Sequence, residues 1–106
     1  MIETVNYLIE NPGLVIGIAG SGKTQIISEM NKILSVVVLC FTNKAVDNLR
    51  QRGVENVFTF DSFEIQKNKV TNLIVDEVSM INSKHMNFIY RLKMQGVRVW
   101  LFGDFD

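Results

Sequence analysis

The 106-residue chain has little of what membrane, secreted and disulfide-bonded proteins carry. Its one cysteine, Cys40, excludes an internal disulfide and a zinc site built from several thiolates. No apolar run approaches the roughly 18 residues of a membrane span, and the N-terminus lacks a secretion signal. Eleven Lys and Arg residues balance eleven Asp and Glu residues, so any contact with nucleic acid must be local. We therefore expect a soluble, intracellular protein with no membrane partner.

The length and the hydrophobic content fit one domain. A chain of 106 residues lies within the roughly 100–200 residues of a typical domain and can close one modest core. The hydrophobic fraction of 47 % is ordinary for a globular protein, which excludes a disordered tail. We expect residues 1–106 to form a single domain.

Short apolar runs alternate with segments of helical spacing. Strand patterns occur at 14–16, 36–41, 57–60, 73–75 and 97–102, and helical patterns at 2–9, 26–34, 45–49 and 86–92. The segment 36–41 is apolar throughout, which is typical of a parallel strand covered on both faces. This order predicts an α/β fold with a mostly parallel sheet of about five strands. In such folds ligands bind beyond the carboxyl ends of the strands.

The segment from Gly17 to Thr24 reads Gly-Ile-Ala-Gly-Ser-Gly-Lys-Thr and fits the phosphate-loop pattern in full. Glycines let consecutive backbone N–H groups turn inward as a nest for phosphate oxygens, and the following helix adds its positive end. Lys23 would reach the β- and γ-phosphates, and the Thr24 hydroxyl would bind Mg²⁺. The alternative is a glycine-rich turn that binds nothing. The predicted nucleotide-binding residues are Gly17, Gly20, Ser21, Gly22, Lys23, Thr24 and Gln25.

A second candidate segment is an apolar strand that ends in two carboxylates, Asp76 and Glu77. Asp76 would hold Mg²⁺, because this ion is usually bound by substrate phosphates and only one or two carboxylates. Glu77 would orient or deprotonate the attacking water. Adjacent side chains on a strand point to opposite faces, so the two would divide their roles just past the strand, where the chain can turn. The alternative is an acidic turn without a function.

Five segments together resemble the motifs of superfamily 1 helicases of the RecD-like and Dda-like branch. The segment 17–24 resembles motif I, and Asp76-Glu77-Val78-Ser79-Met80 resembles motif II. The segment 41–45, Phe-Thr-Asn-Lys-Ala, resembles motif Ia, and 59–63, Thr-Phe-Asp-Ser-Phe, resembles the Thr-x-x-Ser-Phe motif. The segment 101–104, Leu-Phe-Gly-Asp, resembles the start of motif III. The resemblance implies a RecA-like, three-layer P-loop NTPase domain that uses ATP and Mg²⁺.

The same resemblance implies contacts with single-stranded DNA, with RNA not excluded. In the family, motif Ia and the Thr-x-x-Ser-Phe motif line the track of the strand. Thr42, Asn43 and Lys44 would contact the phosphate backbone, and Ser62 and Phe63 would hydrogen-bond or stack. Three alternatives stay open: Thr42 and Asn43 as a helix N-cap, Phe63 as a core aromatic, and Lys44 as a solvated lysine.

The sequence departs from the family's pattern in ways that bear on activity. The 106 residues contain neither a second RecA-like domain, with the arginines that complete the site, nor the motif III glutamine. A glutamine motif for adenine is not evident before the phosphate loop, and Asp61 stands where a histidine is common. We expect the first motor domain of a DNA helicase, truncated within motif III, that binds ATP but hydrolyses it poorly alone. The alternatives are a small P-loop kinase and a non-catalytic nucleotide-binding module.

Several other residues are predicted to be structural. Cys40 is expected to act as a small hydrophobe within a strand. His85 has no partner in sequence and is expected at a helix surface or an interface. Trp100 and the methionines are expected in the core.

Overall fold

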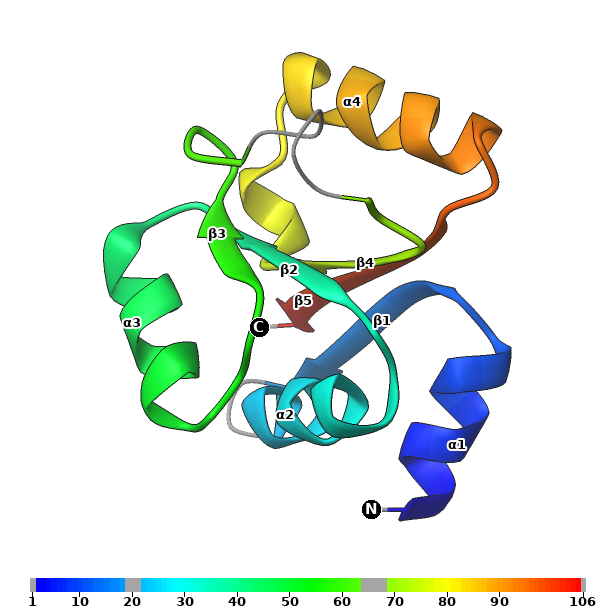
Figure 1. Ribbon diagram of the computed structural model, residues 1–106, viewed down its shortest axis with the longest axis vertical. Helices are drawn as coiled ribbons and strands as arrows, with labels where there is room; N and C mark the ends of the chain where they lie inside the picture. The colour runs from blue at the N-terminus through cyan, green and yellow to red at the C-terminus, as the bar shows by residue number, and fades with distance from the viewer. Residues whose placement is uncertain (1, 19–21, 64–68, 106) are drawn as a thin grey trace.

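The computed structural model describes residues 2–18, 22–63 and 69–105 of the chain (Figure 1). Helices and strands alternate along it, as the hydrophobic pattern predicts. The helices are α1 (Ile2–Glu10), α2 (Lys23–Ile33), α3 (Asn43–Gln51) and α4 (Ser83–Met94), with a short 3₁₀ helix, η2 (Val78–Met80). The strands are β1 (Gly13–Ile18), β2 (Val37–Cys40), β3 (Val57–Thr59), β4 (Asn72–Asp76) and β5 (Arg98–Phe105).

The five strands form one sheet in the order β1-β5-β4-β2-β3, and every neighbouring pair is parallel. The predicted α/β fold with a parallel five-stranded sheet is confirmed. The last strand, β5, lies between β1, which leads into the phosphate-loop segment, and β4, which ends in the acidic pair. Its register sets Gly103 beside Ile16 of β1 and Phe102 beside Asp76 of β4. All strands therefore direct their carboxyl ends to one edge.

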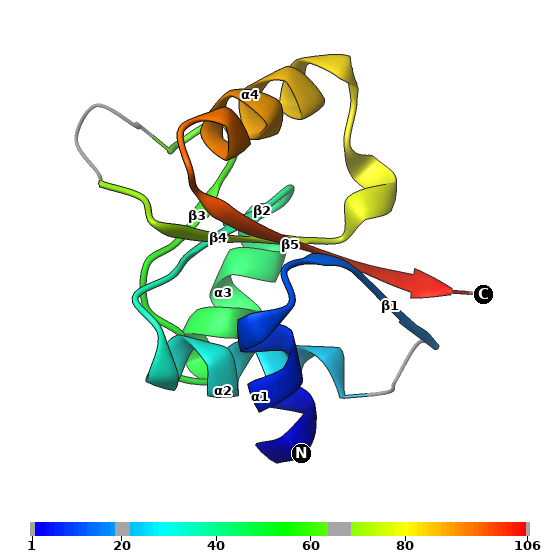
Figure 2. The ribbon, with the colours of Figure 1, turned by 90° about the vertical axis from the view of Figure 1, so that its right-hand side faces the viewer.

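Helices cover both faces of the sheet, which gives three layers (Figure 2). Helices α1, α2 and α3 lie on one face, where Ile27, Ile74 and Trp100 are fully buried. Helix α4 lies on the other face, where Leu39 and Leu73 are fully buried. In the part of the chain that the structure describes, no helix has the length and apolar content of a membrane span.

Trp100 lies in the core as predicted, and its polar atom is satisfied there. The indole N–H donates to the carbonyl of Leu8 at 2.6 Å, and the Arg98 guanidinium donates to the carbonyl of Ile9 at 2.6 Å. These bonds satisfy carbonyls in the last turn of α1, which lack partners within the helix. They attach α1 to the sheet beside β5.

The prediction that the methionines lie in the core is wrong for three of them. Met30 is fully buried, but Met80, Met86 and Met94 are 52 %, 46 % and 70 % exposed. The inner face of α4 consists of positions 85, 88, 89 and 92, which follow helical spacing and contact the sheet or its aromatic neighbours. Positions 86 and 94 fall beside this face, toward solvent.

Candidate nucleotide and nucleic-acid sites

Helix α2 begins where the phosphate-loop pattern places it. Gly22 is the N-cap, with a left-handed backbone (φ +89°) that an L side chain rarely adopts, and Lys23 is the first helical residue. Thr24 is half-buried in the first turn and Gln25 is exposed. The backbone of Gly17 belongs to β1. The predicted nucleotide-binding residues Gly20 and Ser21 lie outside the described residues.

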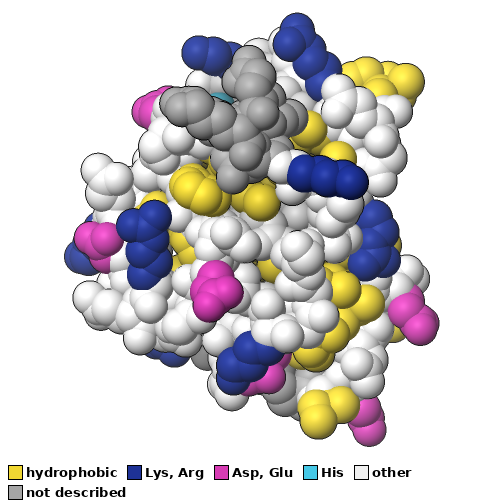
Figure 3. All heavy atoms as spheres, viewed as in Figure 1, with side chains coloured by type: hydrophobic (Ala, Val, Ile, Leu, Met, Phe, Trp, Pro, Cys, Tyr) yellow, Lys and Arg dark blue, Asp and Glu magenta, His cyan; other side chains and the backbone are white. Residues whose placement is uncertain are grey.

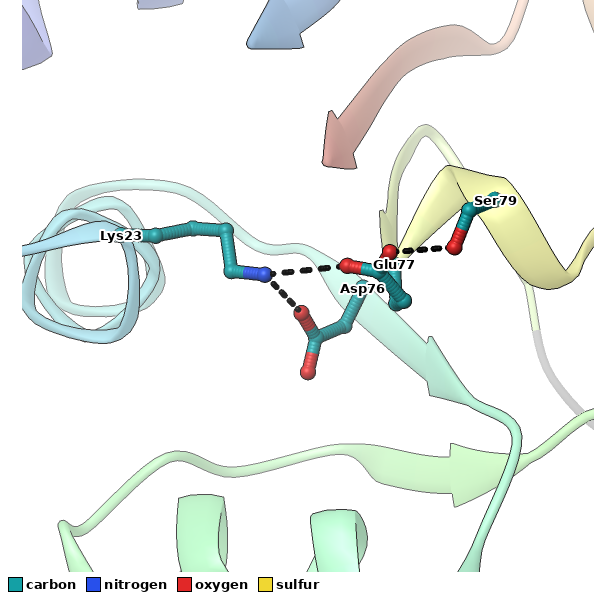
Figure 4. A network of polar contacts seen from close by, with 4 residues as sticks. All are labelled: Lys23, Asp76, Glu77 and Ser79. Carbon is teal, nitrogen blue, oxygen red and sulfur yellow. Dashed lines mark hydrogen bonds and ion pairs between the residues drawn. The ribbon is translucent and has the colours of Figure 1, made fainter. Parts of the chain in front are cut away.

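The structure brings Lys23 together with both carboxylates that the sequence singles out (Figure 4). The Lys23 Nζ lies 3.4 Å from Asp76 Oδ1 and 3.4 Å from Glu77 Oε2. The three side chains are 19 %, 18 % and 29 % exposed. Because they are largely shielded from water, their charges interact more strongly than a surface pair would. We call these three residues the ion-paired cluster.

The backbone of Glu77 lets neighbouring carboxylates reach the same ammonium group. Glu77 has φ +76° and ψ +79°, which is rare for a residue with a side chain. The chain turns here, just past β4, which is where the sequence predicts that the side chains of Asp76 and Glu77 diverge. The Ser79 hydroxyl in η2 donates to Glu77 Oε1 (Figure 4). Backbone strain of this kind is typical of functional sites.

Gly103 in the motif III segment packs tightly against the residue that follows the acidic pair. A Cβ atom built on Gly103 would lie 2.6 Å from Val78 Cγ1, closer than real Cβ contacts come. Gly103 therefore permits a close approach of β5 and η2 that no other residue would allow without a shift. This contact connects the motif II and motif III segments.

Cys40 ends β2 beside the ion-paired cluster and is fully buried, as predicted for a small hydrophobe. Burial, and secondly the negative charge of Asp76, raise the pKa of the Cys40 thiol to about 12. The thiol therefore stays protonated and unreactive at neutral pH.

The segments that resemble the two DNA-contacting motifs lie side by side, at the carboxyl ends of the neighbouring strands β2 and β3. Thr42, Asn43 and Lys44 are exposed at the start of α3. The Thr42 hydroxyl accepts the Ala45 N–H at 3.1 Å, so the N-cap alternative is confirmed for this residue. An exposed hydroxyl can bind a phosphate as well, because its own hydrogen remains available.

The Thr-x-x-Ser part of the segment 59–63 forms a turn that is closed by hydrogen bonds between its first and last residues. The Thr59 N–H donates to Ser62 Oγ at 3.2 Å, and the Ser62 N–H donates to Thr59 Oγ1 at 3.1 Å. Ser62 is exposed, while Phe63 is half-buried with its ring 5.5 Å from that of Phe58. The alternative of Phe63 as a core aromatic is therefore partly correct, since the ring packs and also reaches the surface.

Sequence reasoning missed an aromatic cluster that joins these segments to α4. The Phe60 ring stacks on Phe41, with centroids 4.9 Å apart, and lies 4.5 Å from the His85 ring. His85 completes a capping box with Asn82 at the start of α4, and the Phe88 ring lies one turn further along. The helical spacing of positions 85, 88, 89 and 92 indicates that these residues share one face of α4. Nothing in the sequence indicates that this face packs against Phe41 and Phe60.

Charge on the face of the molecule shown in Figure 3 is dispersed. Lys and Arg side chains are scattered among Asp and Glu on the face in Figure 3, rather than gathered in one patch. Two arginines are committed to the fold: Arg50 donates to the carbonyl of Val57 at 2.8 Å, and Arg98 donates to that of Ile9. Contacts with a polyanion must therefore come from particular residues, as the zero net charge implies.

The sheet order, the helix that starts at Lys23 and the acidic end of β4 define a RecA-like domain of the P-loop NTPase class. The chain belongs to the AAA domain family, whose pattern matches residues 2–106. A search of curated proteins finds no match.

Two solved helicase structures have a similar fold. One contains two coordinating Pif1 helicases that unwind DNA at forked double-stranded DNA; the identity is 23 % and the TM-score 0.61. The other is Bacteroides Pif1 bound to single-stranded DNA, with 25 % identity and a TM-score of 0.58. Each match covers 97 % of this chain, but only 32 % and 30 % of the respective helicase chain. The chain spans about a third of their length and has the fold of a superfamily 1 helicase motor domain.

Proposed function

We propose that residues 1–106 are one ATP-binding motor domain of a DNA helicase, which couples Mg²⁺-dependent ATP hydrolysis to movement along single-stranded nucleic acid. The observation that carries the proposal is the ion-paired cluster: one ammonium 3.4 Å from each of two carboxylates, next to a helix N-terminus. A lysine, two carboxylates and the N–H groups of a helix's first turn are the parts that bind a magnesium nucleotide.

Lys23 would exchange its carboxylate partners for the β- and γ-phosphates when ATP binds. The N–H groups at the start of α2 would bind phosphate oxygens, since they point out of the positive end of the helix dipole. Thr24 and Asp76 supply the hydroxyl and carboxylate oxygens that Mg²⁺ prefers, and the bound ion would neutralise phosphate charge. Lys23 thus marks the position that the γ-phosphate would take.

Glu77 would act as the general base that orients and deprotonates the attacking water. Its carboxylate lies beside Lys23, and one of its oxygens is held by Ser79, which leaves the other toward the phosphate position. A base must lie within hydrogen-bond reach of the proton it takes, so a fixed carboxylate is an advantage. Ser79 is a positioning residue in this proposal.

Single-stranded DNA would cross the exposed start of α3 and the turn after β3. Thr42, Asn43 and Lys44 offer a hydroxyl, an amide and a cation to phosphates, and Ser62 and Phe63 lie beside them. The similar fold of Bacteroides Pif1, solved with single-stranded DNA, supports this choice of partner.

Efficient hydrolysis would need an arginine from a second RecA-like domain. Arg50 and Arg98 bind backbone carbonyls far from the ion-paired cluster in sequence and fold. A small P-loop kinase would likewise need arginines over the transferred phosphate, and these two residues are not available for that role.

A thermal melt with and without Mg-ATP tests nucleotide binding. Ligand at about 100 times its Kd stabilises the native state by about 2.7 kcal/mol. We expect this stabilisation for the natural sequence and its loss in Lys23→Ala. The matched control is Lys32→Ala, which removes a lysine of the same helix that pairs with Glu29 at the surface. Equal stabilisation of both variants would refute the proposal.

A further inference from the structure

A pocket of about 380 Å³ opens between the turn after β3 and the start of α4. The turn contributes Phe60, Asp61 and Phe63, and the helix contributes Lys84, His85 and Phe88, with Asn82 at its cap. None of these residues except Phe63 has a part in the proposed function. We call this site the aromatic pocket.

We propose that the aromatic pocket binds one nucleobase, turned out of a single strand that crosses the neighbouring turn. This inference rests on the proposed binding of single-stranded DNA and adds to it a contact with the base. The volume is near the lower end of the roughly 300–1,000 Å³ of small-molecule sites, so it suits one planar ring system rather than a helix or a duplex.

The walls of the pocket are aromatic and held in place. The rings of Phe41, Phe60 and His85 contact one another: the Phe60 centroid lies 4.9 Å from Phe41 and 4.5 Å from His85, and the Phe41 and His85 centroids are 5.1 Å apart. The Phe88 ring makes T-shaped contacts with the rings of Phe60 and Phe63, at centroid distances of 6.1 and 6.3 Å. His85 cannot turn freely, because its Nδ1 accepts the Asn82 N–H at 3.2 Å. Fixed rings stack on a base at little entropic cost, and any base offers a face to them.

The rim of the pocket is polar and carries both charges. Asp61 can accept hydrogen bonds from the N–H groups at a base edge, and Lys84 can donate to its carbonyl or ring nitrogen atoms. Both residues are exposed. An apolar side chain of a protein partner would use neither of these groups, whereas a base has donors and acceptors on its edge. The mixed rim therefore favours a nucleobase.

The pocket is continuous with the proposed strand track. Phe63 lines the pocket, and the neighbouring Ser62 belongs to the segment that resembles a DNA-contacting motif. Phe41, against which the floor of the pocket packs, immediately precedes Thr42. A strand whose phosphates contact Thr42 and Lys44 would thus carry its bases past the mouth of the pocket.

The test compares two DNA analogues against two matched variants of the chain. The ligands are oligothymidylate and an oligomer of the same length and backbone without bases, and binding is measured by fluorescence anisotropy at low salt. The variants are Phe88→Leu, which loses a wall, and Phe58→Leu, which loses a ring that contacts Phe63 but does not line the pocket. Circular dichroism and stabilisation by Mg-ATP establish that each variant is folded.

We expect Phe88→Leu to raise the Kd for oligothymidylate about fivefold or more, since stacking on an aromatic ring is worth that much. The Kd for the oligomer without bases should change less than twofold, and Phe58→Leu should resemble the natural sequence with both ligands. A second measurement needs no variant: a 5-iodouracil oligomer irradiated with the natural sequence should cross-link to Phe60, Phe63, His85 or Phe88.

Three results would each overturn the proposal that the aromatic pocket binds a base. The natural sequence could bind the two oligomers with equal Kd values, or both leucine variants could weaken binding equally. The third result is cross-links only outside these four residues. Those results would leave the proposed motor function standing. A natural sequence that Mg-ATP stabilises but that binds neither oligomer would overturn the DNA part of the proposed function and the pocket together.

Discussion

The carboxyl edge of the sheet carries two regions of opposite chemistry. The ion-paired cluster lies beside β1 and β4 and consists of a lysine whose Nζ lies 3.4 Å from each of two carboxylates. The aromatic pocket lies beside β3 and α4 and consists mainly of rings, with charge only at its rim. The first suits a small, highly charged ligand, and the second suits a planar, weakly charged one.

The two regions also differ in how the chain builds them. The ion-paired cluster comes from two short segments, each of which already contains its functional residues in sequence. The aromatic pocket combines a turn after β3 with a helix face more than 20 positions later in the chain. The close contact of Gly103 and Val78 lies on the side of the ion-paired cluster. Because the two regions are built from different segments, we expect that substitutions in one region leave ligand binding at the other largely unchanged.

The largest expected effect concerns catalysis by the ion-paired cluster. We expect ATP turnover by the 106-residue chain to lie about 10³–10⁵-fold below that of an intact helicase, because an arginine supplied by a partner domain contributes that factor in related enzymes. Phosphate release from purified protein, with saturating Mg-ATP and single-stranded DNA, measures it. Turnover near that of an intact helicase would show that the cluster is complete without such an arginine.

The next effect tests the close contact between η2 and β5 beside the ion-paired cluster. We expect Gly103→Ala to lower the free energy of unfolding by about 1–3 kcal/mol, because the added methyl overlaps Val78. Urea denaturation measures this change. The control is the double variant Gly103→Ala with Val78→Ala, which should be more stable than Gly103→Ala alone. A double variant that is less stable would contradict the steric explanation.

A smaller effect separates the capping and DNA-binding roles of Thr42. Thr42→Ala should cost about 0.5–2 kcal/mol of stability through the lost N-cap. Thr42→Asp keeps a capping oxygen but sets a carboxylate where a phosphate is proposed to bind, so stability should persist while affinity for oligothymidylate falls. Thr42→Ser should preserve both. If Thr42→Asp binds DNA as tightly as Thr42→Ser, no phosphate lies at this position.

The last effect concerns Cys40 and appears only at alkaline pH. The native thiol has a pKa raised from its ordinary value of 9.0 to about 12, so the native state holds a proton that the unfolded state releases. This stabilisation is complete below pH 9 and is lost as the pH rises through about 12. The natural sequence should therefore lose more stability than Cys40→Ala between these values, as measured by urea denaturation. An equal loss of stability with pH in the natural sequence and in Cys40→Ala would show that the thiol is accessible to solvent.

The fold was largely predictable because burial imposes periodic patterns on each element. The continuous apolar run at 36–41 corresponds to β2, buried on both faces, and the position of Gly22 and Lys23 at a helix start follows from the phosphate-loop pattern. The prediction was wrong for Met86, because a shift of one position on α4 turns a side chain away from the sheet. Hydrophobicity alone does not resolve that shift.

The ion-paired cluster was predictable in its membership but not in its geometry. Lys23, Asp76 and Glu77 stand in recognisable segments, whereas the left-handed backbone of Glu77 and its bond to Ser79 have no signal in sequence. The pairing of His85 with Phe60 was not predictable, because it depends on how α4 lies over the end of the sheet. Contacts between distant segments follow from tertiary packing, which single-sequence patterns do not contain.

Binding of ATP with and without magnesium tests the central claim most directly. Isothermal titration of the natural sequence should give a lower Kd for ATP in Mg²⁺ than in excess chelator, and Asp76→Asn should largely abolish that difference. This result would assign the metal to the carboxylate of Asp76. Full magnesium dependence in Asp76→Asn, or none in the natural sequence, would contradict it.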